Sequence, residues 1–557
     1  MITEPFVLQE KTLGELIDTN AALHPDNDAV IYVSHQLRQT WATLKQDVET
    51  LAKGLMALGV HNGDRVAIWA TNDPHWITLM FACSKIGAIL LPINTSYRKE
   101  ELQFIFEQSD TNVAFIGKGY RDHDFIKTLF SVAPELEAQE KDAIHCATLP
   151  EMRKLVFLGD TVHPGMYTLT EVMGDLAASI SDADYAARAG EVRPHDVTNM
   201  QFTSGTTGFP KGVMLTHVNI LNNGYWIGRH QNFSHVDRVC LPVPFFHCFG
   251  CVLGIMACMN HAATIVVVEC FEPRTVLATI EEERCTAVYG VPTMYLSMLE
   301  HKSFPNTDVS TLRTGIMAGS VCPEPLMRRV INEMNMREIT ICYGLTETSP
   351  VMTQTHADEE FTRRVSTVGR AMPGIEVAII DPATLKEVPR GTVGEVVCRG
   401  YNIMKGYYKM PKETAEAITP EGWLHSGDLG IMDAEGYVII TGRSKDMIVR
   451  GGENIYPREI EEFFSAMPQV FDIQVVGVPS YTYGEEVAAF IIPRKGETIT
   501  QKDLRAFAKG RIAWQKVPRH IQCVPEFPLT ASGKIQKYLL REQAAKLFAD
   551  VASGPDS

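Results

Sequence analysis

Short apolar runs alternate with amphipathic stretches over the first two-thirds of the chain. Residues 66–69 predict a buried strand, residues 73–86 a helix, and residues 88–91 the next strand. The same order of strand, helix and strand returns within residues 312–342. Units of this kind build a parallel sheet that is covered by helices. We therefore predict an α/β fold whose large N-terminal part contains two parallel sheets.

The pattern changes from about Val377 to short strands separated by turns, which predicts a small β-barrel or antiparallel sheet. Residues 442–446 interrupt this pattern. A helix that begins at Pro457 and two further apolar strands then predict a compact α+β module with its own core. We place a domain boundary at the interruption, with an N-terminal domain of residues 1–443 and a C-terminal domain of residues 444–557.

Length and composition fit a multidomain globular protein. The 557 residues exceed what one hydrophobic core supports, and 45% hydrophobic and 21% charged residues are ordinary proportions. The net charge of −16 argues against a nucleic-acid partner, which needs a basic face. No signal-peptide pattern opens the chain, and no uninterrupted apolar run is long enough to span a membrane. We expect a cytoplasmic protein without a transmembrane segment.

The 12 cysteines do not follow the spacing of a disulfide framework, and most stand in apolar surroundings that predict reduced core thiols. One group, His247, Cys248, Cys251, Cys258 and His261, contains a single Cys-x2-Cys spacing. That spacing is too little for a zinc site, so we do not expect zinc there.

Residues 203–212 (Thr-Ser-Gly-Thr-Thr-Gly-Phe-Pro-Lys-Gly) predict a loop that wraps a polyphosphate. Glycines let successive backbone N–H groups converge on one anion, hydroxyls add donors, and the lysine adds positive charge. Strands are expected on both sides, whereas a Walker P-loop opens directly onto a helix and has another spacing. The candidate phosphate-binding residues are Thr203, Ser204, Gly205, Thr206, Thr207, Gly208 and Lys211.

Polar groups follow two neighbouring strands of the second α/β unit. Residues 343–347 (Tyr-Gly-Leu-Thr-Glu) place an aromatic face, a hydroxyl and a carboxylate within one turn, suited to adenine, phosphate and Mg2+. Gly319 and Ser320 follow the other strand and let a flat ring approach the backbone. Because the carboxyl ends of parallel strands meet at one edge, the two turns should lie side by side. An inward-packed tyrosine with a helix cap is the other interpretation.

Three further polar positions have both a functional and a structural interpretation. Asp428 is expected at a strand–turn junction, where its carboxylate either accepts hydrogen bonds from both ribose hydroxyls or closes an Asx turn. Arg443 either joins the same ribose or pairs with a surface acid. Lys534, on a glycine turn near the C-terminus, is either a reaching catalytic cation or a solvated lysine.

Phe245, Phe246 and His247 follow two prolines and predict a rigid aromatic turn. A histidine in apolar company is either a satisfied core residue or part of a pocket wall. The sequence leaves both interpretations open.

Together these motifs resemble the adenylate-forming superfamily of acyl-CoA synthetases, adenylation domains and luciferases. The resemblance spans nearly the whole chain, and residues 444–457 and 529–537 are especially similar to medium-chain fatty acyl-CoA synthetases. It implies an AMP-forming fatty acid–CoA ligase that uses ATP, Mg2+ and coenzyme A. Its partners would be these small molecules, while homodimer formation and peripheral membrane contact stay open.

The resemblance also implies a role for each candidate residue. Catalysis would involve Lys534, Thr346, Glu347 and His247, with Glu347 and Thr207 as metal ligands. Besides the phosphate loop, the nucleotide would contact Gly319, Ser320, Tyr343, Gly344, Asp428 and Arg443. Coenzyme A would contact Gly451, Gly452 and Glu453. The hinge would be Lys445, and the acyl pocket would be lined by Phe246, Val291, Met317, Ala318 and Val351.

The implied mechanism has two steps. The carboxylate of the acid attacks the α-phosphorus of ATP to give acyl-AMP and pyrophosphate, and the thiol of coenzyme A then attacks the acyl carbon. Lys534 and the thiol need the same approach, so the C-terminal domain would rotate about Lys445 between the steps.

The identity of the acid depends on the pocket. Because the implied pocket residues are mostly apolar, an alkyl tail fits better than an amino acid. The alternatives are an aryl- or short-chain acyl-CoA ligase, a domain that loads a carrier protein, a luciferase-like adenylating oxygenase, and a nucleotide-binding regulator without turnover.

Overall fold

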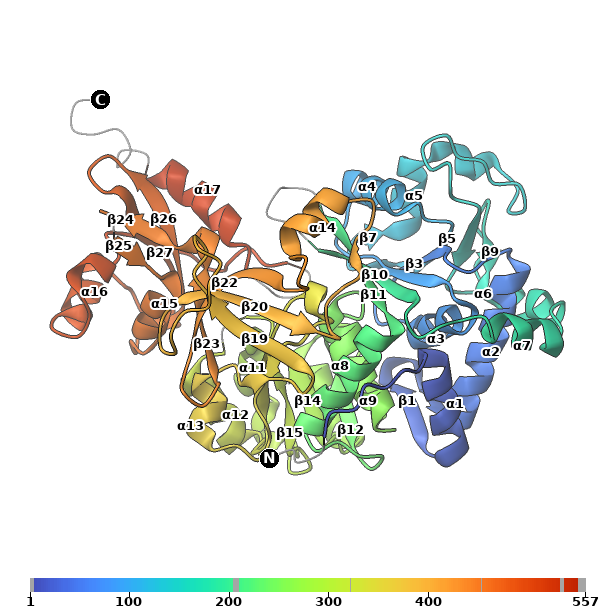
Figure 1. The fold of residues 1–557 in the computed structure, drawn as a ribbon, viewed down its shortest axis with the longest axis horizontal. Helices are drawn as coiled ribbons and strands as arrows, with labels where there is room; N and C mark the ends of the chain where they lie inside the picture. The colour runs from blue at the N-terminus through green and yellow to red at the C-terminus, as the bar shows by residue number, and fades with distance from the viewer. Residues whose placement is uncertain (1–4, 204–209, 321, 452, 531–534, 549–557) are drawn as a thin grey trace. The chain divides into compact units, whose positions relative to one another are not determined.

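A computed structural model describes residues 5–203, 210–320, 322–451, 453–530 and 535–548 (Figure 1). The chain divides into two compact units. The first comprises Met1–Glu376 and Cys398–Leu424, and the second comprises Val377–Val397 and His425–Ser557.

The first unit contains an eight-stranded sheet with helices on both faces. The strand order is β21 (Gly406–Tyr407), β11 (Lys211–Thr216), β10 (Val197–Thr203), β4 (Ile89–Pro92), β3 (Arg65–Trp69), β5 (Val113–Ile116), β8 (Lys154–Phe157) and β9 (Tyr167–Thr168). From β10 to β9 the neighbours are parallel, while β11 is antiparallel to both β10 and β21. Figure 1 shows α4 (Lys99–Ser109) and α5 (Phe125–Val132) on one face and α3 (Trp76–Ile86) on the other. Every residue of α3 is buried, and its one charged residue, Lys85, forms an ion pair with Asp18 at 2.5 Å.

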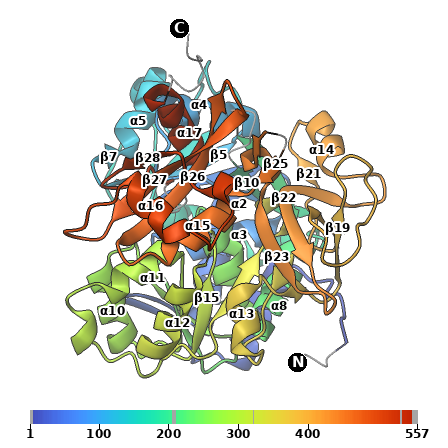
Figure 2. The ribbon, with the colours of Figure 1, turned by 90° about the vertical axis from the view of Figure 1, so that its left-hand side faces the viewer.

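A nine-stranded sheet forms the rest of the core of this unit. Its order is β18 (Arg370–Ala371), β17 (Thr353–Gln354), β16 (Thr340–Tyr343), β15 (Thr314–Met317), β14 (Ala287–Gly290), β12 (Arg238–Leu241), β13 (Thr264–Val267), β1 (Asp28–Tyr32) and β2 (Leu37–Thr40). The strands from β16 to β1 are parallel neighbours, and antiparallel strands close both ends. The helices α10 (Pro273–Glu282), α11 (Pro292–Leu299) and α12 (Glu324–Glu333) pack next to one another in this order (Figure 2). The two predicted parallel sheets are thereby confirmed.

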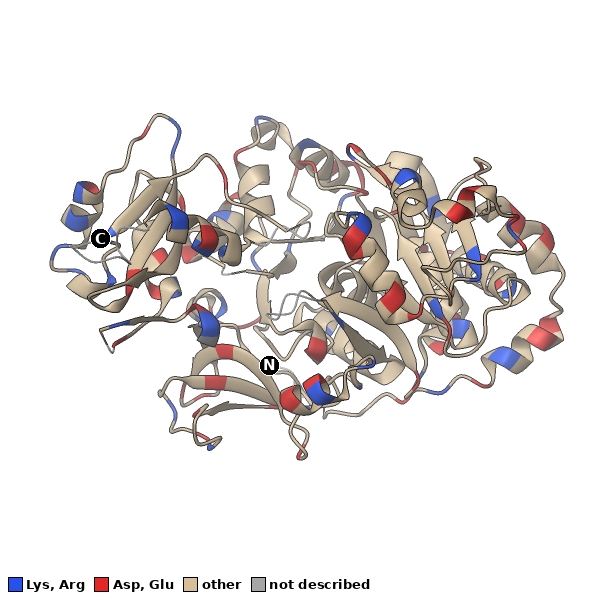
Figure 3. Cartoon of the chain, turned by 90° about the horizontal axis from the view of Figure 1, so that it is seen from above, with Lys and Arg blue, Asp and Glu red and all other residues tan. Residues whose placement is uncertain are grey.

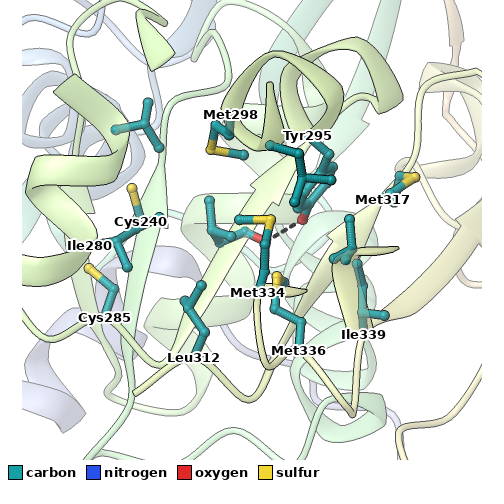
Figure 4. Close-up of a cluster of buried hydrophobic side chains, with 14 of the residues drawn as sticks. Cys240, Ile280, Cys285, Tyr295, Met298, Leu312, Met317, Met334, Met336 and Ile339 are labelled. Atoms are coloured by element: carbon teal, nitrogen blue, oxygen red, sulfur yellow. Dashed lines mark hydrogen bonds between the residues drawn. The ribbon is translucent and has the colours of Figure 1, made fainter. Parts of the chain in front are cut away.

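Side chains from these helices and strands form one large buried cluster (Figure 4). Tyr295 on α11 donates its hydroxyl to the carbonyl oxygens of Val288, at 2.7 Å, and Ile316, at 3.1 Å. One buried hydroxyl therefore links the helix to the adjacent strands β14 and β15.

The region from about Val377, predicted as a small β-barrel or an antiparallel sheet, is an open sheet. Its four strands follow the order β19 (Ile375–Ile380), β20 (Gly394–Gly400), β22 (Leu424–Met432) and β23 (Val438–Arg443). A barrel closes only when its first and last strands pair, and in the described part of the chain β19 does not pair with β23. Short strands and turns were predicted correctly, but closure is a long-range property that they do not determine.

The C-terminal residues form a second sheet in the same unit, with β25 (Glu453–Ile455), β24 (Ile448–Arg450), β27 (Gly484–Pro493), β26 (Val470–Ser480) and β28 (His520–Cys523). The helices α15 (Pro457–Ser465), α16 (Gln501–Ala508) and α17 (Lys537–Leu547) complete it. Arg450 and Glu486 form a buried bidentate ion pair at 2.6 and 2.9 Å. The compact C-terminal module is therefore present, and the boundary at residues 443 and 444 stays a prediction.

Replacing Asp472 on β26 by asparagine is expected to stabilise the protein at neutral pH. Burial raises the pKa of the Asp472 carboxyl to about 6, only partly offset by the hydrogen bond from the backbone N–H of Ile473. The folded state therefore retains a proton that the unfolded chain has lost, so stability falls as pH rises from about 4 to about 6 and stays lower above that. At about 1.4 kcal/mol per pKa unit, the gain from Asp472→Asn is at most about 3 kcal/mol near neutral pH.

Thermal denaturation of the parent and the Asp472→Asn protein measures this gain. We expect a higher midpoint for the variant near neutral pH and a smaller difference near pH about 5, where the parent carboxyl is mostly protonated. An equal difference at both pH values would contradict the assignment.

Charged residues of both signs are interspersed along the elements shown in Figure 3. Among the described helices, none combines the length and the apolar character needed to cross a membrane. All twelve cysteines lie in described positions as free thiols, and most are buried.

Candidate functional site

The predicted phosphate loop is closed at its base by strand pairing. β10 and β11 run antiparallel, as predicted for the loop flanks, with Thr203 directly opposite Lys211. Residues opposite each other on paired strands extend their side chains to the same face. The loop residues Ser204, Gly205, Thr206, Thr207 and Gly208 lie outside the described residues. Of the predicted phosphate-binding groups, the structure therefore positions the hydroxyl of Thr203 and the ammonium of Lys211.

The two predicted turns, residues 319–320 after β15 and residues 343–347 at the end of β16, lie at one edge of the nine-stranded sheet, as predicted. They are called the exit turns below. β15 and β16 are parallel neighbours, so Gly319 and Ser320 leave the sheet beside Tyr343 and Gly344. Gly319 has a φ of +89°, a conformation that glycine adopts without steric cost. A β-carbon at Gly344 would come within 1.9 Å of the carbonyl oxygen of Pro350. The backbone itself therefore requires glycine in both turns.

Thr346 and Glu347 begin the 3-10 turn Thr346–Thr348 directly after the second exit turn. Thr346 is buried, and the sulfur of Cys248 lies 3.4 Å from its hydroxyl oxygen. Glu347 is half-buried, and its carboxylate Oε1 accepts a hydrogen bond from the hydroxyl of Tyr407 at 2.8 Å. The carboxylate that was predicted to bind Mg2+ is thus oriented by a tyrosine.

The aromatic turn that contains His247 lies against Thr346. The contact is made by Cys248, the residue after His247. His247 Nδ1 accepts the backbone N–H of Phe249 at 3.1 Å, which in the neutral ring leaves the proton on Nε2. Cys248 follows and is buried against the Thr346 hydroxyl. A β-carbon at Gly250 would lie 2.3 Å from the carbonyl oxygen of Pro244, so the turn is tight. His247 is therefore a half-buried residue held beside the exit turns.

Tyr407 is a residue of this site that the sequence reasoning missed. The ammonium of Lys211 lies 4.9 Å from the centre of its ring, while its hydroxyl binds Glu347. The position of Tyr407 depends on the pairing of β21 with β11, between segments far apart in the sequence. A glycine–tyrosine pair in a short strand carries no local sign of that pairing.

The donors at this position fit a magnesium ion. Mg2+ prefers oxygen ligands, usually one or two carboxylates together with water and substrate phosphates. Glu347 offers a half-buried carboxylate with one oxygen engaged by Tyr407, at the edge where the exit turns end. Thr207, the other predicted ligand, lies outside the described residues. Glu347 is the described residue that would hold the ion.

In the second unit, Asp428 and Arg443 are brought together. They are directly opposite on the antiparallel strands β22 and β23, and Arg443 Nε lies 3.2 Å from Asp428 Oδ1. The Asp428 side chain is only 7% exposed, whereas the Arg443 side chain is 61% exposed and so accessible to a ligand. Asp428 lies within a strand and not at the strand–turn junction we predicted, because the chain re-enters extended pairing after Gly427 (φ +70°).

The remaining C-terminal candidates are spread over the same unit. Lys445 lies in the 3-10 turn Ser444–Asp446, and its carbonyl oxygen accepts a hydrogen bond from Arg541 on α17 at 3.1 Å. Gly451, with a φ of +61°, begins the turn between β24 and β25, and Glu453 on β25 accepts a hydrogen bond from Gln515 at 2.9 Å. Gly452 and Lys534 lie outside the described residues.

One of the five predicted acyl-pocket residues, Met317, packs in the large buried cluster, and the other four do not. Met317 belongs to the buried cluster of Figure 4, which does not include Phe246, Val291, Ala318 or Val351. Its assignment to the pocket stays a prediction. The backbone of Val351 is held on both sides by the amide of Asn223, at 3.1 and 2.8 Å.

Comparison with known proteins decides the family. Residues 17–408 match the family model of the AMP-binding enzyme, and residues 459–534 match that of the AMP-binding enzyme C-terminal domain. The chain belongs to the AMP-binding enzyme family. Adenylation of an acid followed by thioester formation with coenzyme A is the chemistry that this membership, together with acyl-CoA synthetase relatives, implies. ATP, Mg2+ and coenzyme A are the corresponding small molecules.

Relatives of this AMP-binding enzyme include YngI of Bacillus subtilis, whose name ranks it among the acyl-CoA synthetases. It is 48% identical over 97% of the chain and 98% of its own length. The mitochondrial medium-chain acyl-CoA ligase ACSF2 of Bos taurus is 38% identical over 96% of the chain and 88% of its own length.

Solved structures of the same family agree over nearly the whole length. ATP-bound MatB from Rhodopseudomonas palustris has a TM-score of 0.82 at 27% identity, covering 96% of this chain and 99% of its own. A fatty acyl CoA synthetase of Mycobacterium tuberculosis has a TM-score of 0.68 at 26% identity, with the same coverage of both chains. The predicted α/β fold with a large N-terminal part and a smaller C-terminal part is confirmed.

Replacing Asp428 by asparagine is expected to raise the KM of this AMP-binding enzyme for ATP by about ten- to a hundredfold. A buried carboxylate accepts hydrogen bonds from two ribose hydroxyls as a charged group, and such bonds are stronger than those to a neutral amide. Steady-state kinetics with ATP and with 2′-deoxy-ATP measure the effect. The parent should discriminate against the deoxy nucleotide and the variant should not; unchanged discrimination would contradict ribose binding.

Proposed function

We propose that the protein is an AMP-forming fatty acyl-CoA synthetase, an acid–thiol ligase that activates medium-chain fatty acids. The observation that carries this proposal is the contact of Tyr407 with both Lys211 and Glu347. Tyr407 therefore connects Lys211, at the base of the predicted phosphate-binding loop, with the carboxylate of Glu347 in the predicted adenine-binding segment, residues 343–347. Medium chain length is supported by the name of the ACSF2 relatives and by the apolar character of the candidate pocket residues.

The reaction turns a poor acyl donor into a good one. A carboxylate oxygen of the fatty acid attacks the α-phosphorus of ATP, the bond to the bridging oxygen breaks, and pyrophosphate leaves with its electron pair. The acyl carbon of the resulting mixed anhydride is then attacked by the sulfur of coenzyme A, whose thiol proton is lost. The acyl–oxygen bond breaks, and AMP leaves with the oxygen that came from the acid.

The residues contribute binding and charge. Thr203 and Lys211 bind phosphate oxygens, Tyr343 stacks on the adenine, and Asp428 with Arg443 binds the ribose. A magnesium ion held by Glu347 would neutralise phosphate charge. Lys534 stabilises the negative charge that grows on the α-phosphoryl oxygens during attack, a contribution that is strong in a site from which water is excluded.

Lys445 is the proposed hinge between domains 1–443 and 444–557. Arg541 supports this assignment, because it donates to the Lys445 carbonyl oxygen at 3.1 Å and to the Asp446 carboxylate at 2.8 Å. The hinge turn is thereby tied to α17, so residues after Lys445 would move with that helix as one body. Gly451, Gly452 and Glu453 would line the approach of coenzyme A.

The acyl pocket is proposed from five residues, with His247 at its entrance: Phe246, Val291, Met317, Ala318 and Val351. Val291, Ala318 and Val351 are buried and apolar, which favours an alkyl tail through the hydrophobic effect. We propose a cytoplasmic location, since the described chain carries no membrane-spanning helix. A homodimer and peripheral membrane contact are both compatible with these residues.

Pyrophosphate release with benzoic acid and with saturated acids from butanoic to hexadecanoic acid, with and without coenzyme A, tests the function. We expect the highest kcat/KM for acids of medium length, and thioester formed in equal amount to AMP. A preference for benzoic acid would favour an aryl-CoA ligase. Light emission or oxygen uptake in place of thioester would favour the oxygenase, and either result would overturn the proposal.

A further inference from the structure

Tyr407 contacts two charged groups of the candidate site. Its hydroxyl donates to Glu347 Oε1 at 2.8 Å, and the Lys211 ammonium lies 4.9 Å from the centre of its ring, within cation–π range. Glu347 follows an exit turn of the nine-stranded sheet, and Lys211 opens β11 of the eight-stranded sheet. One side chain therefore joins groups that two different sheets supply.

The backbone around Tyr407 is fixed from both sides. β21 pairs antiparallel with β11, with Tyr407 opposite Val213. The N–H of Met404 donates to the carbonyl oxygen of Glu347 at 3.0 Å, and the N–H of Tyr408 donates to that of Gly212 at 2.8 Å. The ring of Tyr407 is thus carried by a segment bound to the very elements that it bridges.

The hydrogen bond between Tyr407 and Glu347 engages one of the two carboxylate oxygens. Burial raises the pKa of Tyr407 above its ordinary value, and the negative charge of Glu347 raises it further. The Tyr407 hydroxyl donates to Glu347, so Oε1 is occupied as an acceptor. Among the described residues, Oε2 of the same carboxylate has no hydrogen-bond partner.

The neighbouring tyrosine serves another purpose. Tyr408 donates its hydroxyl to Asp110 Oδ2 at 2.8 Å, and Lys409 binds Oδ1 of the same carboxylate at 2.6 Å. Tyr408 lies in the turn that follows β21, and its hydroxyl has a different partner from that of Tyr407. The chain thus offers two adjacent tyrosines that both donate to a carboxylate, one in the candidate site and one outside it.

We propose that Tyr407 is a positioning residue for magnesium-bound ATP. It turns the Glu347 carboxylate so that Oε2 faces the cation, and its ring holds the Lys211 ammonium at the base of the phosphate loop. The inference rests on the proposed function, in which Glu347 binds Mg2+. A carboxylate rotates freely about its last bonds, and a single hydrogen bond of good geometry restricts it before the ion binds.

Calorimetric binding of ATP to Tyr407→Phe, Tyr407→Leu and parent protein, with Mg2+ and with a chelator, tests this role. In Tyr407→Phe the ring remains and the hydroxyl is lost, so we expect magnesium-ATP to bind about tenfold more weakly. Binding of ATP in the chelator should stay within about twofold of the parent. Tyr407→Leu also loses the ring, so ATP should bind more weakly in both conditions.

Tyr408→Phe is the matched control, because it removes the same atom from a tyrosine one residue away. Its affinity for ATP should equal that of the parent with and without Mg2+. Thermal midpoints of all variants show whether each protein is folded at the temperature of the titration.

The selective loss of the magnesium-dependent affinity in Tyr407→Phe would support the inference. Parent-like binding of magnesium-ATP by that variant would overturn it, and so would an equal loss in both conditions, which indicates a structural role only. If Tyr407→Phe loses magnesium-ATP affinity but the parent forms no AMP with any acid, the proposed function fails while the positioning role stands.

Discussion

Lys534→Ala is expected to lower the rate of acyl-adenylate formation by about a hundred- to a thousandfold. Loss of one preorganised positive group that faces developing charge in a dry site has this size of effect on kcat. Thioester formation from chemically supplied acyl-AMP and coenzyme A should remain within about twofold, since no charge then develops on a pentavalent phosphorus. Single-turnover measurements of each half-reaction separate the two.

Lys537→Ala provides the control for this substitution. Lys537 lies three residues away and its ammonium binds Glu461 at 2.6 Å, which is a structural ion pair within the second unit. Its loss should leave adenylation intact. If Lys534→Ala slows both half-reactions equally, the alternation of domains about Lys445 is contradicted, and Lys534 acts in some common step.

Glu347→Gln is expected to lower the rate of adenylation about a hundredfold at ordinary Mg2+ concentrations. The amide keeps the shape of the side chain and can still accept the hydrogen bond of Tyr407, but it loses the negative charge that attracts a hard cation. Part of the loss should therefore be recovered as Mg2+ is raised. Supplied acyl-AMP has already lost its pyrophosphate, so thioester formation from it should be unaffected.

Glu376→Gln is the corresponding surface control, because Glu376 forms an exposed ion pair with Arg399 and should tolerate the change. A Glu347→Gln enzyme with parent rates and parent dependence on Mg2+ would remove Glu347 from the metal site. The same result would contradict the proposed role of Tyr407 in positioning the Glu347 carboxylate for Mg2+.

The local pattern of apolar and polar residues predicted much of the fold, because these helices and strands are specified by residues close together in the sequence. The strands beside the phosphate loop, the α3 helix between β3 and β4, and the helix at Pro457 all follow from apolar runs and their ends. The meeting of Gly319 with Tyr343 was also predictable, since right-handed crossovers place consecutive parallel strands side by side.

Other features depend on which distant segments pair. Tyr407 is in the site because β21 adds to β11, and nothing near residue 407 encodes that partner. The open sheet in place of a barrel, and Asp428 in mid-strand opposite Arg443, have the same origin. Met317 was assigned to the pocket by the family resemblance, and its membership of the large buried cluster could not be read from the local pattern. The alternation of residues along a strand does not show which face of the sheet other elements of the fold cover.

The central claim is that a fatty acid carboxylate attacks the α-phosphorus of ATP. It is tested most directly with a medium-chain acid labelled with heavy oxygen in its carboxylate, incubated with enzyme, magnesium-ATP and coenzyme A. Mass spectrometry of the products should find one labelled oxygen in each AMP and none in pyrophosphate. Label in pyrophosphate or inorganic phosphate, or thioester formed with unlabelled AMP, would contradict the account.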